Sequence, residues 1–209
     1  VDDAKPFAIL YGTEQAEQVA SANLPDDVLH IVTEDKDHAI SLASLIETDD
    51  DTAPPVLPPE PDDAMISYTS GTTGNPKGVV YHHRGAYLNA LSTAFAAVLT
   101  PNSVYLWTLP MFHCNGWTYT WAVTAMAGTH ICLRRIESTR IFQLISDEGV
   151  THMAGAPVIL NMIANAPAME RQVFAQQVEI TVGGAPPPSP VIAAVEKMGF
   201  RVPHLYGLT

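Results

Sequence analysis

Residues 67–79 read Ser-Tyr-Thr-Ser-Gly-Thr-Thr-Gly-Asn-Pro-Lys-Gly-Val, and this stretch follows a short apolar run. Glycine allows positive φ angles and a close approach of the backbone to a ligand, so successive N–H groups can turn toward one anion. The Ser and Thr hydroxyls add further donors, and the Lys77 ammonium adds positive charge. The stretch therefore predicts a loop that binds a polyphosphate.

A loop of this composition has two other interpretations. A Walker-type loop needs glycine directly before its lysine and Ser or Thr directly after it. Here Pro76 precedes Lys77 and Gly78 follows it, so the spacing excludes that motif. A glycine-rich turn without a ligand is the structural alternative, but such a turn does not require two threonines, a serine and a lysine together.

Strand-like and helix-like segments alternate along the chain, which predicts an α/β fold with mostly parallel sheets flanked by helices. Apolar runs of strand length occupy residues 7–11, 28–32, 65–69, 104–109, 129–133, 151–154, 178–182 and 202–206. Helices are predicted at 14–22, 84–99, 117–127, 139–148, 157–164 and 190–198, the last with Ser189 as its N-cap. We expect the phosphate loop to connect strand 65–69 to helix 84–99.

Proline and acidic residues divide the chain into three predicted parts. Residues 1–46 form an α/β segment of an incomplete subdomain, residues 47–63 form an acidic, proline-rich linker, and residues 64–209 form the core. Residues 48–61 contain five prolines, whose fixed φ and missing N–H oppose regular pairing. The chain lacks an initiator Met and stops inside a further motif, so we expect it to be a segment of a longer protein.

Composition excludes several classes of function. The formal net charge of −12, with 10 Lys and Arg residues, argues against nucleic acid or an anionic membrane as partner. The two cysteines form no Cys-x-x-Cys pair and no His-Glu-x-x-His occurs, so neither a disulfide framework nor a metal site is expected. Without a signal peptide or an apolar run of about 18 residues, the chain is predicted to be cytoplasmic, with no membrane span.

The stretch from Tyr68 to Gly78 resembles the first signature of the adenylate-forming, or AMP-binding, superfamily, which includes acyl-CoA synthetases, luciferases and peptide-synthetase adenylation domains. The resemblance covers residues 64–209 well and residues 1–46 only as a general α/β pattern. It implies part of the large N-terminal domain of such an enzyme. It assigns the ATP phosphates to the loop residues Thr69, Ser70, Gly71, Thr72, Thr73, Gly74 and Lys77.

Three further segments carry the resemblance. Residues 110–117, Pro-Met-Phe-His-Cys-Asn-Gly-Trp, resemble the segment that lines the acyl pocket, which implies substrate roles for His113, Asn115 and Gly116. A buried structural histidine is the alternative for His113, and a His113–Cys114 nucleophile pair lacks an orienting third group. By the same resemblance, Gly183 belongs to the pocket, Gly184 and Ala185 contact adenine, and Tyr206, Gly207 and Thr209 bind the nucleotide, with Tyr206 stacked on adenine and Thr209 at the α-phosphate.

The resemblance implies ATP-dependent activation of a carboxylic acid to an acyl-adenylate, followed by thioester formation with CoA. The acid is expected to be a short- to medium-chain fatty or an aromatic acid, and Lys77, His113 and Thr209 are the implied catalytic residues. The family's Mg²⁺-binding Glu would follow Thr209, so residues 1–209 alone are expected to be inactive. Two alternatives stay open: a domain that loads a carrier-protein thiol, and a nucleotide-binding module without turnover.

Overall fold

The computed structural model describes residues 4–33, 40–47, 57–69 and 74–209. The chain divides into two compact units, Val1–Leu57 and Pro58–Thr209, which are described separately. The division falls inside the predicted linker at 47–63, of which residues 48–56 lie outside the described part of the chain. The three-part domain organisation stays a prediction.

The first unit contains the small parallel pair that the sequence predicts. Strands β1 (Ala8–Tyr11) and β2 (Leu29–Val32) pair in parallel. The 3₁₀ turn η1 (Thr13–Gln15) and helix α1 (Ala16–Ser21) connect them. Helix α2 (Leu42–Ile46) was not predicted; it begins with a capping box in which the side chains of Ser41 and Ser44 each accept the backbone N–H of the other residue.

The second unit begins with an antiparallel hairpin of β3 (Asp63–Thr69) and β4 (Lys77–His82), in which Thr69 pairs with Lys77. Helix α3 (His83–Ala96) starts only after β4, where His82 Nδ1 accepts the Gly85 N–H at 2.7 Å. The prediction that the phosphate loop leads directly into this helix is therefore wrong. The β-branched pair Val79 and Val80 favours a strand at this place, and the loop joins two strands.

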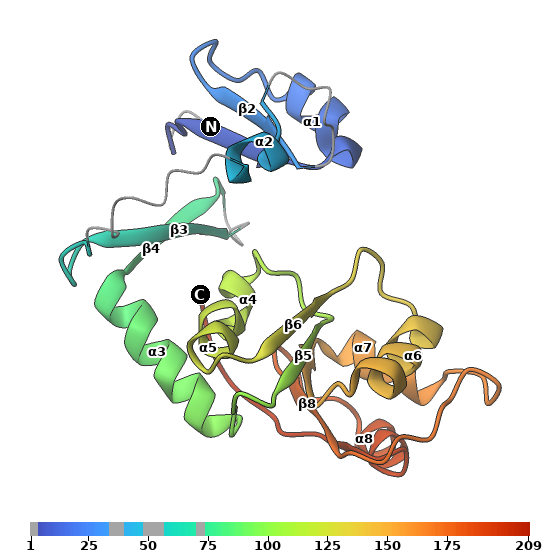
Figure 1. Ribbon diagram of the computed structural model, residues 1–209. Helices are drawn as coiled ribbons and strands as arrows, with labels where there is room; N and C mark the ends of the chain where they lie inside the picture. The colour runs from blue at the N-terminus through green and yellow to red at the C-terminus, as the bar shows by residue number, and fades with distance from the viewer. Residues whose placement is uncertain (1–3, 34–39, 48–56, 70–73) are drawn as a thin grey trace. The chain divides into compact units, whose positions relative to one another are not determined.

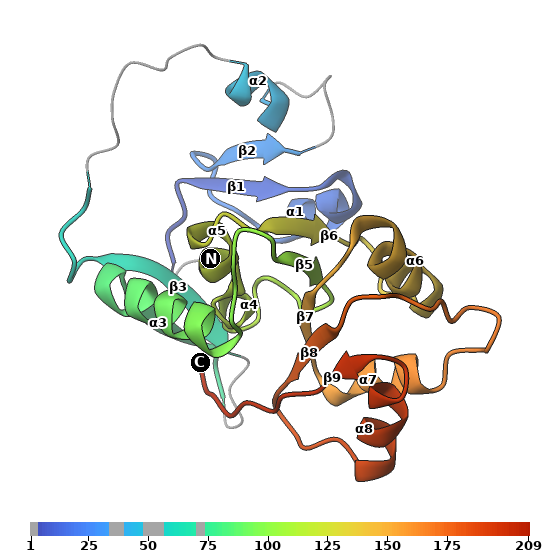
Figure 2. The same ribbon diagram turned by 60° about the horizontal axis from the view of Figure 1, so that its bottom comes forward.

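A five-stranded parallel sheet forms the centre of the second unit, in the order β6-β5-β7-β8-β9. Its strands are β5 (Val104–Trp107), β6 (Thr129–Cys132), β7 (His152–Gly155), β8 (Val178–Val182) and β9 (Phe200–Arg201). Helices α6 (Ser138–Glu148), α7 (Pro157–Ala164) and α8 (Ser189–Glu196) lie on one face (Figures 1 and 2). The predicted α/β class is confirmed, with one antiparallel hairpin added.

The two faces of this sheet differ in chemistry. Toward α6, α7 and α8 the strands direct aliphatic side chains such as Leu106, Met153 and Ile180, all buried in one core cluster. On the other face, Tyr105 and Trp107 pack with α3 and with α5 (Tyr119–Ala125) in a second cluster. Aliphatic packing therefore anchors one side of the sheet, and aromatic packing the other.

Several element boundaries differ from the sequence predictions, and three of the differences affect the region around α5 and the C-terminal part of the chain. The helix predicted at 117–127 is divided into α4 (Cys114–Trp117) and α5, because Asn115, Gly116 and Thr118 have positive φ angles. The last strand is β9, two residues before the predicted 202–206, and only an isolated bridge joins Val182 to His204. Ser189 is wrong as the N-cap of α8, because it is the first helical residue and Pro188 takes the extended N-cap position.

No helix in the described ranges has both the length and the apolar character needed to cross a bilayer.

Two buried tyrosines stack on each other and differ in how their hydroxyls are satisfied. The Tyr105 and Tyr119 rings are stacked with centroids 4.6 Å apart. The Tyr119 hydroxyl pairs with Thr181 Oγ1 at 3.0 Å, whereas the fully buried Tyr105 hydroxyl has no partner among the described residues. Burial, with the neighbouring Tyr119 as a second cause, raises the pKa of Tyr105 well above its usual value.

We predict opposite effects of removing these two hydroxyls. Tyr105→Phe should leave the free energy of unfolding unchanged or raise it, because its hydroxyl loses hydration on folding and gains no partner. Tyr119→Phe should cost about 1–3 kcal/mol, because Thr181 is left unpaired. The raised pKa of Tyr105 means that, as the pH rises, this tyrosine ionises in the unfolded state before it does so in the folded state. The free energy of unfolding should therefore fall above pH 10.0, and it should fall less steeply in Tyr105→Phe than in the parent protein. Urea denaturation of both variants across pH tests this, and a larger loss in Tyr105→Phe would contradict it.

Candidate functional site

A cavity of about 320 Å³ opens in the second unit. Its walls come from β4 (Tyr81), α3 (Asn89, Thr93), the α4–α5 segment (His113, Cys114, Trp117, Thr118, Trp121), the turn after β8 (Gly184) and the C-terminal residues Leu205, Tyr206, Gly207 and Leu208. This volume lies at the lower end of the range for small-molecule sites, roughly 300–1,000 Å³. Segments far apart in sequence therefore converge on one pocket.

The segment from Cys114 to Thr118 shapes this pocket by an unusual backbone. All five residues have positive φ angles, between 43° and 69°, although only Gly116 lacks a Cβ. Such conformations cost energy in non-glycine residues and persist only where the surroundings impose them. A hydrogen bond from Asn89 Nδ2 to Thr118 Oγ1 ties the segment to α3. The strained turn brings His113, Cys114 and Trp117 to the cavity wall.

Two glycines permit close packing behind this wall. A Cβ at Gly116 would lie 2.7 Å from Cζ3 of Trp107, and the φ of Gly116 is +60°. A Cβ at Gly183 would lie 2.9 Å from Cη2 of Trp117 and 3.0 Å from Cδ1 of Leu205. Gly116 thus fits under an aromatic ring, whereas Gly183 contacts two residues that line the cavity.

Tyr81 and Cys114 form the polar end of the pocket near the last residue of the chain. The Cys114 sulfur lies 3.0 Å from Thr209 Oγ1, a hydrogen bond in which either group can donate. Burial, followed by the neighbouring Cys114, raises the pKa of Tyr81, so its hydroxyl stays protonated and able to donate at neutral pH. Hydroxyl and thiol groups therefore surround this part of the cavity.

The structure brings together some of the residues that the sequence predicts for the site. His113, Gly184, Tyr206 and Gly207 line the cavity, and Thr209 reaches it through Cys114. Asn115, Gly116, Gly183 and Ala185 do not line it: the Asn115 carbonyl accepts the Thr120 hydroxyl, and Gly116 and Gly183 are buried. The assigned roles of all these residues stay predictions.

The predicted phosphate residues lie on the hairpin. Lys77 is exposed and pairs in register with Thr69, and Gly74 is exposed between the strands. Ser70, Gly71, Thr72 and Thr73 lie outside the described residues. The Thr69 hydroxyl and the Lys77 ammonium group therefore belong to directly paired residues at the two ends of the loop.

Sequence reasoning missed most of the polar wall. Tyr81, Asn89, Thr93 and Thr118 were not selected, although all four line the cavity. Asn89 and Thr93 are four residues apart on α3, which places them on one helix face. That spacing was a usable signal, since polar residues four apart on a helix can line one side of a site. No comparable signal marks Tyr81, whose position follows from the register of the hairpin.

The residues present fit a nucleotide in part. Nothing lies within 4 Å of the Cβ position of Gly184, and only Leu205 lies at 4.0 Å from that of Gly207. Tyr206 is 89% exposed as a residue, so a planar base has both open backbone and an aromatic side chain to contact. Lys77 and Thr69 are suited to phosphate oxygens.

The described residues do not form a Mg²⁺ site. No Asp or Glu lines the cavity, and in the described ranges no three His, Cys, Asp or Glu residues gather as metal ligands. Protein-bound Mg²⁺ typically takes one or two carboxylates together with phosphate oxygens. No role in the chemistry is therefore assigned to a metal held by these residues.

Comparison with known proteins establishes the family. The family model of the AMP-binding enzymes matches residues 1–209, so the chain belongs to the AMP-binding, adenylate-forming family. The predicted membership and the predicted fold are both confirmed. The inhibitor-bound N-terminal domain of FACL13 from Mycobacterium tuberculosis superimposes with a TM-score of 0.81 at 28% identity, over 99% of this chain and 52% of that one.

Two curated plant relatives are CoA ligases. A 2-methylpropanoate–CoA ligase of Humulus lupulus is 47% identical over 175 residues, which are 83% of this chain and 31% of that protein. A peroxisomal trans-cinnamate:CoA ligase of Petunia hybrida is 46% identical over 154 residues, or 74% of this chain and 27% of that protein. The chain thus spans about a third of the length of these relatives. The cytoplasmic location stays a prediction, because one relative is named as peroxisomal.

The packing of Gly116 leads to a stability prediction. Gly116→Ala should cost about 1–3 kcal/mol, because its Cβ would meet the Trp107 ring in a left-handed conformation. Gly207→Ala is the matched control, because its Cβ would meet nothing closer than Leu205 at 4.0 Å. Urea denaturation of both variants measures the difference. Equal stability of the two would show that the Trp107 contact does not constrain this turn.

Proposed function

We propose that these residues belong to an enzyme that activates a carboxylic acid with ATP and then transfers the acyl group to CoA. The observation that carries the proposal is the single cavity on which His113, Gly184, Tyr206 and Gly207 converge, with Thr209 held beside it by Cys114. Membership of the AMP-binding family and the CoA-ligase relatives support it.

In the first step, a carboxylate oxygen attacks the α-phosphorus of ATP, and the bond between the α-phosphorus and the pyrophosphate oxygen breaks. Negative charge grows on the transferred phosphoryl group and on the leaving pyrophosphate, and preorganised donors lower the barrier by binding that charge. Lys77 and Thr69 would bind the leaving phosphates, and the Thr209 hydroxyl would donate to the α-phosphate. His113 and Tyr81 lie on the cavity wall, where they would orient the acid.

In the second step, the CoA sulfur attacks the carbonyl carbon of the acyl-adenylate, AMP leaves with the bonding electron pair, and the thiol proton passes to solvent. The relatives support a CoA acceptor through their names. A carrier-protein thiol is the competing acceptor. Product analysis with CoA and with a pantetheinylated carrier protein, each supplied alone, distinguishes the two. A protein that forms neither product and no adenylate would be the inactive nucleotide-binding module.

The acid is proposed to be a short- to medium-chain fatty or an aromatic acid. Trp117 and Trp121 supply flat apolar surface to a cavity of about 320 Å³, which suits a small apolar body with one charged end. The named substrates of the relatives, 2-methylpropanoate and trans-cinnamate, belong to these two chemical classes.

Acid-dependent exchange of labelled pyrophosphate into ATP tests the adenylation step. The full-length protein that contains this chain should catalyse exchange with at least one acid of a panel of short fatty and aromatic acids. Lys77→Ala should lower kcat/KM for ATP by roughly 10- to 100-fold, the effect of losing one charge-assisted hydrogen bond of about 1.5–3 kcal/mol. Lys197→Ala, at the end of α8, is the control. Absence of exchange with every acid by folded protein would refute the function.

Gly183→Ala should affect the acid more than the nucleotide. Its new methyl group would displace Trp117 or Leu205, both of which line the cavity. We expect KM for the acid to rise about tenfold or more, the effect of a steric change worth roughly 1–3 kcal/mol, while KM for ATP changes less than threefold. Steady-state kinetics and a thermal unfolding control measure this. Equal increases in both constants would show that Gly183 serves the fold and not the acid pocket.

A further inference from the structure

A second cavity, of about 290 Å³, lies beside the first and shares three of its walls, Thr93, Trp117 and Leu205. Its other walls are Ala96 at the end of α3 and Ala97 directly after it, Tyr119, the β8 residues Glu179 and Thr181, and the C-terminal residues Pro203 and His204. The two cavities therefore have the Trp117 side chain as a common wall, and this ring also lies against Gly183.

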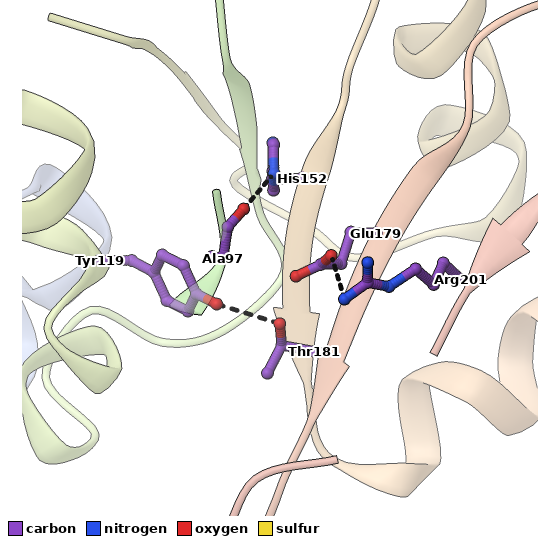
Figure 3. Close-up of polar contacts among 6 residues, drawn as sticks. All are labelled: Ala97, Tyr119, His152, Glu179, Thr181 and Arg201. Atoms are coloured by element: carbon purple, nitrogen blue, oxygen red, sulfur yellow. Dashed lines mark hydrogen bonds and ion pairs between the residues drawn. The ribbon is translucent and has the colours of Figure 1, made fainter. Parts of the chain in front are cut away.

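Three residues that line this second cavity, Tyr119, Glu179 and Thr181, make polar contacts (Figure 3). Tyr119 reaches from α5 to Thr181 on β8, where their hydroxyls form the 3.0 Å hydrogen bond. Two residues earlier on the same strand, Glu179 Oε2 pairs with the Arg201 guanidinium at 3.2 Å. The Ala97 carbonyl is already engaged, because it accepts the Nε2–H of His152 at 2.9 Å.

The Glu179 carboxylate keeps the capacity to bind a ligand. Its side chain is only 12% exposed, whereas that of Arg201 is 53% exposed, so solvent screens the arginine more than the carboxylate. Within the described part of the chain, the other carboxylate oxygen, Oε1, has no hydrogen-bond donor. A half-buried carboxylate with a spare oxygen accepts hydrogen bonds and repels a second carboxylate.

The remaining walls of the cavity are mostly apolar. Ala96, Ala97, Trp117, Pro203 and Leu205 are the apolar residues, and Thr93 and His204 are the other polar ones. This arrangement fits an apolar stem that ends in a hydrogen-bond donor. It does not fit a stem that ends in a negative charge, which would lose its hydration beside Glu179.

We propose that Glu179, with Thr181, forms a subsite that recognises the far end of the acid. This inference rests on the proposed function, because it places the reacting carboxylate in the first cavity and the tail of the same acid in the second. The subsite favours an acid with a terminal hydroxyl over the unsubstituted acid of equal length. It rejects the dicarboxylic acid of that length, so the substrate class is an ω-hydroxy monocarboxylic acid.

Pyrophosphate exchange with three matched series of acids tests the subsite in the full-length protein. Unsubstituted, ω-hydroxy and α,ω-dicarboxylic straight-chain acids of butyrate to decanoate length are compared by kcat/KM. At the length that spans both cavities, the hydroxy acid should exceed the unsubstituted acid about tenfold, as one added charge-assisted hydrogen bond predicts. The dicarboxylic acid should fall at least tenfold below the unsubstituted one. Equal rates for all three series at every length would refute the subsite.

Two matched variants separate recognition from a structural role of the ion pair. Glu179→Gln removes the charge, so it should relax the rejection of the dicarboxylic acid at least fivefold. Arg201→Gln breaks the same ion pair and leaves the carboxylate unneutralised, so it should keep or strengthen that rejection. Arg201 is not a wall of the cavity. If both variants shift the preference in the same direction, the ion pair serves only the fold and the subsite is wrong.

A further variant and a binding measurement complete the test. Where Glu179→Gln does not fold, Thr181→Val should reduce the preference for the hydroxy acid about threefold or more and leave the rejection of the dicarboxylic acid intact; an unchanged preference would overturn the subsite. Quenching of tryptophan fluorescence by each acid reports binding without catalysis. Discriminating binding without any exchange would refute the proposed function and retain the subsite, whereas exchange without discrimination would refute the subsite alone.

Discussion

The contact between the Trp107 ring and Gly116 is the constraint on which the site depends. A hydrogen bond to the neighbouring strand holds the Trp107 ring in place: its indole N–H donates to His130 Nδ1, and the two nitrogen atoms are 3.0 Å apart. Its ring leaves no space for a side chain at residue 116, so the backbone passes close to the ring in a left-handed conformation. That conformation divides the helical segment and brings Trp117 to the wall that both cavities share.

The sequence predicts the regular elements of the second unit better than its exceptions. Strand β8 and helix α7 have the predicted limits, because a short β-branched run and a helix that begins with proline are determined locally. The hairpin and the division between α4 and α5 were missed for the opposite reason. Lys77 pairs across the hairpin with Thr69, and Thr118, in its left-handed conformation, accepts a hydrogen bond from Asn89 on another helix, so both features depend on contacts that the local pattern does not show.

The residues of the candidate site also fall into two groups, those that the sequence predicts and those that only the structure reveals. His113, Gly184 and Tyr206 were found through motif resemblance, and they meet at one cavity. Tyr81 and Thr118 carry no motif and reach the cavity only through strand register and through a hydrogen bond to α3. Glu179 also carries no local signal, because one charged residue in an apolar strand shows its surroundings only when the neighbouring strand and helix are in place. These residues are recognised from the tertiary packing and not from the sequence pattern.

Successive side chains of β8 face two different environments, so they are subject to different constraints. Val178, Ile180 and Val182 are fully buried in the aliphatic core, whereas Glu179 and Thr181 face the second cavity. A substitution at the first set alters the packing of three helices, while one at the second set alters a cavity wall. Substitutions at residues 179 and 181 can therefore reshape the cavity without entering the aliphatic core, but each gives up one polar contact, the Glu179–Arg201 ion pair or the Tyr119–Thr181 hydrogen bond. One strand of five residues thus combines a fixed framework with a cavity wall that can change at a limited cost.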